Sequence, residues 1–105
     1  MKELLEERIK KWLESLNEEE RCQAEVLDAY FTFRRNLPSE DPGFGKAIED
    51  HKTTDEVIDD LMPMMYVKKS VVVDYMRNHD YHITTIGDGT VKWAIWRFPD
   101  KSILT

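Results

Sequence analysis

Cysteine is almost absent from this 105-residue sequence, in which Cys22 is the single example. One cysteine excludes a disulfide within the chain, and a reducing compartment such as the cytoplasm is expected. No apolar run approaches the roughly 20 residues that a membrane-spanning helix needs, so no membrane partner is expected. The first residues are at once acidic and amphipathic, which argues against a secretory signal.

Basic residues are the minority among the charged ones, and this limits binding to nucleic acids. The chain has 15 Lys and Arg against 21 Asp and Glu, a formal net charge of −6 at pH 7. Lysine and arginine supply the affinity for phosphates, so only a local basic surface could bind DNA. With 41% apolar and 34% charged residues, the composition predicts one globular domain over residues 1–105.

The motifs of enzymes and metal sites are also missing. The sequence has no glycine-rich phosphate-binding loop and no nucleophile motif, so we expect a non-enzymatic protein without a cofactor. His79, Asp80 and His82 lie close together, but a metal site normally needs three or four convergent ligands. We therefore expect no metal, with His79 packed against the core. Cys22, at helical spacing, is interpreted as a small buried residue.

Two amphipathic helices are predicted in the N-terminal part, residues 1–37. An apolar stripe at spacings of three and four indicates the first helix: Leu5, Ile9, Trp12 and Leu16. Asn17-x-x-Glu20 has capping-box spacing and predicts that a second helix begins there, although one long bent helix is the alternative. The inner side of the second helix would carry Cys22, Val26, Tyr30, Phe33 and Leu37.

Residues 38–52 are predicted to form a loop. Two prolines and two glycines occur between Pro38 and Gly45, and Pro38 ends the helix that precedes it. Phe44 is the aromatic residue of this stretch, and we expect it to anchor the loop to the core.

The remaining segment, residues 53–98, begins with two predicted helices. Thr53-x-x-Glu56 is another capping box and opens a short helix that Pro63 ends. A second helix is predicted over about residues 68–78. The inward sides of these two helices would carry Val57, Ile58 and Leu61, and Val71, Val72, Tyr75, Met76 and His79.

A tight β-hairpin is predicted after these helices. Residues 81–86 and 91–98 have the pattern of strands, and the Asp-Gly pair between them favours a tight turn. On a regular strand Trp93 and Trp96 point to opposite faces. The face toward the core would carry Val91, Trp93 and Ile95. The other face would be covered by the helix that carries Trp12, or would be an exposed contact patch for a partner.

The order of these elements resembles that of winged-helix regulators. Residues 56–61 are similar to the first helix of their helix-turn-helix, residues 67–81 to the recognition helix and its exit, and the hairpin stands where the wing would. The chain departs from the pattern in bulky Ile58, in the longer turn over residues 62–66, and in Asp80 instead of an exit glycine. The resemblance implies an α+β fold, with two N-terminal helices packed on a helix-turn-helix and a two-stranded hairpin.

The resemblance also implies a regulatory binding module that contacts duplex DNA. A helical wheel and the hairpin offer these DNA-binding candidates: Lys68, Lys69, Ser70, Arg77 and Lys92. The preceding helix would turn an acidic face toward the phosphates: Asp55, Glu56, Asp59 and Asp60. The alternative is therefore an acidic protein-binding module, such as an adaptor, an antitoxin-like partner or an inhibitor of a nucleic-acid-binding protein. Its partner would be a basic protein, and a homodimer is a further alternative.

Overall fold

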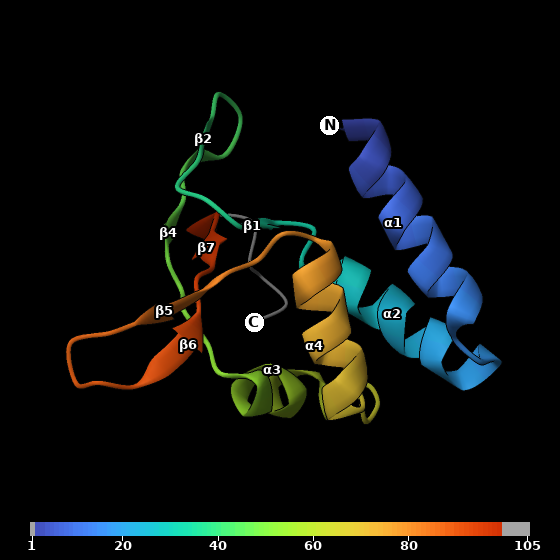
Figure 1. Ribbon diagram of the computed structural model, residues 1–105. Helices are drawn as coiled ribbons and strands as arrows, with labels where there is room; N and C mark the ends of the chain where they lie inside the picture. Colours follow the sequence, from blue (N-terminus) through green and yellow to red (C-terminus); the bar gives the residue numbers. More distant parts are fainter. Residues whose placement is uncertain (1, 100–105) are drawn as a thin grey trace.

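The computed structural model describes residues 2–99 and combines helices with small antiparallel sheets, so the α+β class is confirmed. The helices of this part are α1 (Lys2–Ser15), α2 (Glu18–Tyr30), α3 (Thr54–Leu61) and α4 (Lys69–Asn78). Figure 1 shows α1 and α2 on one side of the molecule and the strands gathered on the opposite side. The helices α3 and α4 join the two sides and pack against each other.

Two separate N-terminal helices are present, so the alternative of one bent helix is wrong. The Asn17 side chain accepts a hydrogen bond from the Glu20 N–H at 2.8 Å, and the Glu20 carboxylate accepts one from the Asn17 N–H at 3.1 Å. The predicted capping box is therefore confirmed, and α2 begins directly after it. Arg21 satisfies the end of α1, because its Nε donates to the Leu13 carbonyl at 3.1 Å.

The inner side of α2 agrees with the prediction only in part, because Val26 and Tyr30 pack against the core and the other predicted residues of the stripe do not lie on a buried side of the helix. Cys22 is exposed rather than buried, and Gln23 and Leu27 face the core instead. Leu37, 61% exposed, lies beyond the helix, which ends at Tyr30. The predicted stripe continues past Tyr30, where the helix ends. Because α2 has apolar residues on more than one side, its contacts with neighbouring helices determine which side is buried.

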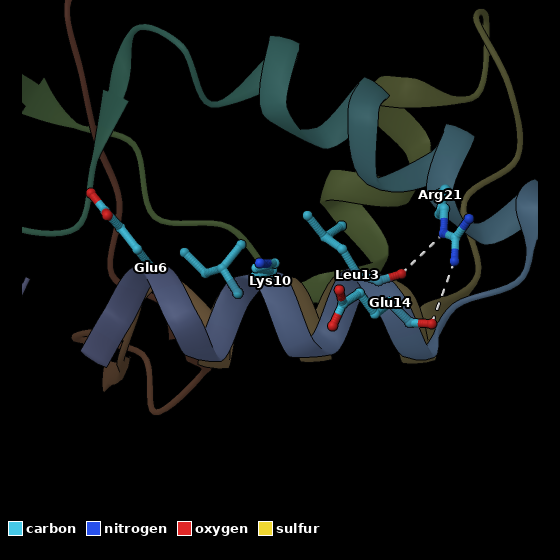
Figure 2. A pocket seen from close by; sticks show the side chains of 6 residues that line it. Glu6, Lys10, Leu13, Glu14 and Arg21 are labelled. Atoms are coloured by element: carbon cyan, nitrogen blue, oxygen red, sulfur yellow. Dashed lines mark hydrogen bonds between the residues drawn. The ribbon is translucent and has the colours of Figure 1, made fainter. Parts of the chain in front are cut away.

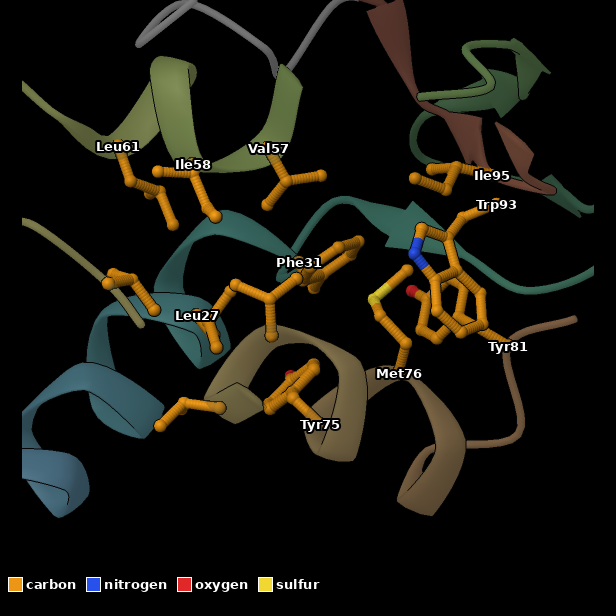
Figure 3. Close-up of a cluster of buried hydrophobic side chains, with 13 residues drawn as sticks. Leu27, Phe31, Val57, Ile58, Leu61, Tyr75, Met76, Tyr81, Trp93 and Ile95 are labelled. Carbon is orange, nitrogen blue, oxygen red and sulfur yellow. The ribbon is translucent and has the colours of Figure 1, made fainter. Parts of the chain in front are cut away.

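The inward sides of α3 and α4 agree closely with the prediction. Thr53 and Glu56 form the second capping box. All the predicted inward residues of α3 and the first four of α4 are buried, and His79 stacks on Tyr75 with 3.9 Å between ring centroids. Figure 3 shows these helices meeting α2 around Leu27 and Phe31. One cluster of aliphatic and aromatic side chains therefore joins the three helices to Trp93 and Ile95.

Residues 38–52, for which the sequence predicts a loop, contain three short strands. They are β2 (Glu40–Asp41), β3 (Gly45–Lys46) and β4 (Ile48–Glu49), and β2 pairs with β3. Gly45 has a φ of +81°, a conformation that glycine adopts without strain. Phe44 contacts the rings of Phe33 and Phe98 at centroid distances of 5.4 and 5.5 Å, so its anchoring role is confirmed.

The predicted long strand over residues 91–98 is broken in two. The first part, β6 (Val91–Trp93), forms a hairpin with β5 (Ile83–Thr85), and Lys52 forms a bridge to Trp93 on the other edge of β6. The second part, β7 (Trp96–Arg97), is the centre of a sheet between β1 (Arg34–Arg35) and β4. The break occurs at buried Ile95, whose N–H donates to His51 Nδ1 at 2.9 Å.

The broken strand also changes what covers the hairpin. Trp12 lies against Tyr75 of α4, with 6.2 Å between ring centroids, so its predicted role over the hairpin is wrong. Trp96 instead packs on His51 at 5.1 Å. Val91, predicted to face the core, is 52% exposed, because the hairpin projects beyond the helices at this point.

Candidate interaction surface

The residues predicted to bind DNA lie at the start of α4, in its last turn, where Arg77 is found, and on the hairpin. Three of the five candidates form ion pairs with acids of other elements. These pairs join Lys68 to Glu20 at 3.5 Å, Lys69 to Asp55 at 3.3 Å, and Lys92 to Glu56 at 3.4 Å. Ser70 and Arg77 are exposed on α4, and Arg77 forms no ion pair within residues 2–99. The structure thus places a carboxylate beside each of the three lysines.

The acidic face consists of Asp55, Glu56, Asp59 and Asp60, all on α3. Asp55 and Glu56 take part in the ion pairs just described, whereas Asp59 is exposed and has no ion pair in the described part of the chain. The backbone hydrogen bond from Thr53 is the main reason that the pKa of Glu56 lies below its ordinary value, and Lys92 adds to the effect. The Glu56 carboxylate is therefore ionised at neutral pH.

Asp60 connects the acidic face to α2. Its carboxylate accepts a hydrogen bond from the Tyr30 hydroxyl at 2.5 Å and lies 3.0 Å from Lys52 Nζ. Burial raises the pKa of Asp60, but the Tyr30 hydrogen bond and Lys52 outweigh it, and the pKa falls below its ordinary value. Burial and the bond to Asp60 raise the pKa of Tyr30, so its hydroxyl stays protonated as the donor.

A polar network continues from Asp60 into the sheet. Asp50 lies among three cations, at 3.3 Å from Arg97, 3.8 Å from Arg34 and 3.9 Å from Lys52. Arg34 is buried, and its guanidinium lies 3.8 Å from the centroid of the Tyr30 ring. The polar network, made of Tyr30, Arg34, Asp50, Lys52, Asp60 and Arg97, therefore ties α2 and α3 to the strands.

A groove of about 750 Å³ lies above this network, between α2, α3 and the turn that follows α3. Its apolar lining comes from all three elements and consists of Val26, Ala29, Phe33, Leu61, Pro63 and Met64. Its polar lining includes the network and the exposed carboxylate of Asp59. Sequence reasoning missed this groove, although the long turn with its methionines was a signal.

A second hollow, of about 500 Å³, lies between α1 and the start of α2 (Figure 2). Arg21 crosses it and donates hydrogen bonds to the carbonyl oxygens of Leu13 and Glu14 at 3.1 and 3.4 Å. Arg21 thus serves the junction of the two helices.

Other kinds of site find little support in this part of the chain. Among residues 2–99, no three His, Cys, Asp or Glu side chains are grouped so that they could hold a metal ion. No helix of the described residues is both long and apolar enough to cross a membrane.

Known proteins give no lead on the role of these surfaces. No protein-family model, curated protein or solved structure matches the chain. Function therefore has to be inferred from the charges and shapes of the surfaces themselves.

Proposed function

We propose that this chain is a cytoplasmic, non-enzymatic regulatory module of winged-helix type that binds a basic protein through its acidic face, rather than duplex DNA. The winged-helix assignment is supported by the order of α2, the bridging residue Lys52, α3, α4 and the β5–β6 hairpin, and by the packing of α3 on α4. The choice of partner depends on charge.

One observation carries the choice of a protein over DNA: Lys68, Lys69 and Lys92 each have a carboxylate within 3.5 Å. The Lys69–Asp55 pair is exposed and the other two are partly exposed, and pairs of this kind add little stability, so the lysines are not locked in place. A phosphate bound to any of them would nevertheless lie close to that carboxylate, and the repulsion would cancel much of the attraction. Arg77 alone cannot supply the several phosphate contacts on which DNA affinity depends.

The same ion pairs occupy Asp55 and Glu56, so the preference for a basic protein depends on Asp59, which is exposed without an ion pair among the described residues, and on the charge of the whole chain. The whole chain has a net charge of −6, and Asp88 adds another carboxylate in the turn between β5 and β6. An acidic surface steers the approach of a basic partner and competes with nucleic acid for the same binding groove. This supports the class of inhibitors of nucleic-acid-binding proteins.

The test compares partner retention by the wild-type chain and by an acidic-face variant, Asp55→Asn with Glu56→Gln and Asp59→Asn. Glutamine at position 56 preserves the capping box, so the fold should survive. A control variant neutralises three exposed acids elsewhere, at Glu7, Glu14 and Glu25, and has the same net charge. We expect basic proteins that bind the immobilised wild type to be lost at least about tenfold from the first variant but retained by the control. Equal retention by both variants would contradict the proposal.

DNA binding is the second candidate, because Ser70 and Arg77 are exposed on α4, Ser70 next to Lys69 at its start and Arg77 in its last turn. Fluorescence anisotropy with random-sequence duplex DNA at about 50 mM salt tests it directly. We expect no saturable binding. Micromolar or tighter binding that weakens steeply with salt, is lost in Lys69→Ala and Arg77→Ala, and improves in Asp59→Lys would favour DNA instead.

A further inference from the structure

We infer that the groove between α2 and α3 receives an apolar side chain from a basic segment of the protein partner, with a lysine or arginine of that segment at Asp59. This inference rests on the proposed function and extends it from the acidic face of α3 to a groove with an apolar wall. Three observations support it: the ordered turn that exposes Met64, the size of the groove, and the carboxylate of Asp59 in its lining.

The turn that follows α3 forms one wall of the groove. It is well ordered, since the N–H groups of Met64 and Met65 donate to the Leu61 carbonyl at 2.8 and 3.0 Å. This order holds Met64 over the groove with 69% of its surface exposed. An exposed methionine gains free energy when a partner covers it, and its flexible thioether adapts to different shapes. Of the residues inserted into the helix-turn-helix, Met65 packs against the core, whereas Met64 lines the groove and is available to a partner.

The opposite wall and the size of the groove suit a large apolar side chain. Val26, Ala29 and Phe33 line it from α2 and the residues that follow. The volume of about 750 Å³ lies within the range of roughly 300–1,000 Å³ that is typical of ligand pockets. Hot spots of protein interfaces are usually aromatic side chains held in such pockets.

The charges in the groove select a cation rather than an anion. The cations of the polar network are already occupied, because Arg34, Lys52 and Arg97 all face the carboxylate of Asp50. The Asp60 carboxylate is held by Tyr30 and Lys52. The lining has three cations and three acids, but Arg34, Lys52 and Arg97 share only the carboxylates of Asp50 and Asp60. Asp59 is the lining acid that remains exposed without an ion pair among the described residues, so a negative charge at Asp59 is open to a partner.

Two small probes of similar shape and opposite charge test this selection. Tryptamine has an indole ring with an ammonium group, and indole-3-propionate has the same ring with a carboxylate. In titrations followed by ¹⁵N NMR, we expect tryptamine to shift the amides of residues 29–33, 59–62 and 64 saturably. The carboxylate probe should bind up to about fivefold more weakly, which is the difference that an exposed ion pair supplies. Equal binding of the two probes, or shifts outside the groove only, would overturn the inference.

Matched variants separate the groove from its surroundings. Met64→Ala should weaken tryptamine binding several-fold, whereas Met62→Ala, in the same turn but outside the groove lining, should not. Asp59→Asn should remove the preference for the cationic probe, and Asp55→Asn should preserve it. No effect of Met64→Ala would overturn the inference.

The same methionine variants separate this inference from the proposed function. If Met64→Ala loses retained basic proteins while Met62→Ala keeps them, the groove is part of the interface. If the acidic-face variant loses them but both methionine variants keep them, the proposed function stands and the groove inference fails. If tryptamine binds as expected but the acidic-face variant loses no protein, the proposed function fails instead.

Discussion

The side-chain oxygen of Gln23 on α2 accepts a hydrogen bond from the backbone N–H of Lys68, which precedes α4, at 2.8 Å. Gln23 is 2% exposed, and Lys68 has no side-chain cap of its own. In α2 and α3 the backbone N–H of the N-cap residue donates instead to the side chain of a glutamate three residues later. At the corresponding position α4 has Val71, which cannot accept a hydrogen bond through its side chain. A residue of one helix therefore completes the start of another.

Gln23→Met should destabilise the protein by about 1–3 kcal/mol, because it keeps the size of the side chain but leaves the Lys68 N–H buried without an acceptor. Urea unfolding followed by circular dichroism measures the change. The control is Glu25→Met at an exposed position of the same helix, which should change the free energy of unfolding by no more than about 0.5 kcal/mol. Equal stability of the two variants would show that the bond contributes nothing.

Asp80, which follows the C-cap residue His79 of α4, has a φ of +60°, a left-handed conformation that is strained for most residues other than glycine. Asp80→Ala should cost about 1–2 kcal/mol because an alanine Cβ is strained in this region, whereas Asp80→Gly should be close to neutral. Both variants lose the exposed ion pair with Arg8 at 2.8 Å, so the difference between them isolates the backbone. Thermal unfolding would measure it, and identical midpoints would exclude strain at this position.

His79 should make stability depend on pH. Burial against Tyr75 lowers the pKa of His79 below its ordinary value of 6.5, although Asp28 and Asp80 oppose the effect. The folded state then binds fewer protons than the unfolded state as the pH falls below that value, so the free energy of unfolding should decrease toward acid.

The variant His79→Phe preserves the ring stacking but cannot be protonated. Urea unfolding between about pH 7.5 and 5.5 should therefore show a flatter pH dependence for this variant than for the wild type. Parallel profiles would assign the pH dependence to other groups.

Phe44 should determine the order of the β2–β3 hairpin. Phe44→Ala removes the contacts to Phe33 and Phe98 and should cost about 1–3 kcal/mol, at the low end for a core phenylalanine because the ring is half-buried. Hydrogen exchange of residues 40–46 should accelerate more than that of α4. Leu37→Ala removes an exposed apolar side chain from the segment before β2, and it should change the free energy of unfolding by no more than about 0.5 kcal/mol and leave the hydrogen exchange of residues 40–46 unchanged.

Local patterns in the sequence predicted local structure well. The two capping boxes, at Asn17 and Thr53, and the inward sides of α3 and α4 all agree with the structure. These features depend on residues three or four positions apart, whose geometry is the same in every helix. The anchor at Phe44 was predictable for a related reason, since an aromatic residue in a polar loop usually packs inward.

Features that depend on distant residues were missed. The rotation of α2 follows from its contacts with α3 and α4, and neither Gln23 nor Cys22 reveals it from spacing alone. The break in the strand at Ile95 depends on a hydrogen bond to His51, which lies 44 positions away. The groove was missed because its walls come from α2 and from the turn after α3.

By itself the sequence determined the α+β class, the starts of α2 and α3, and the sides of α3 and α4 that are buried. Those properties depend on spacing and capping within one or two helical turns. Only the tertiary structure decided which charges neutralise one another, because Lys68 and Glu20, 48 positions apart, meet only after the helices pack. Charge counts along a chain carry no information on such pairs, so the balance between a DNA-binding and a protein-binding surface is set by the packing.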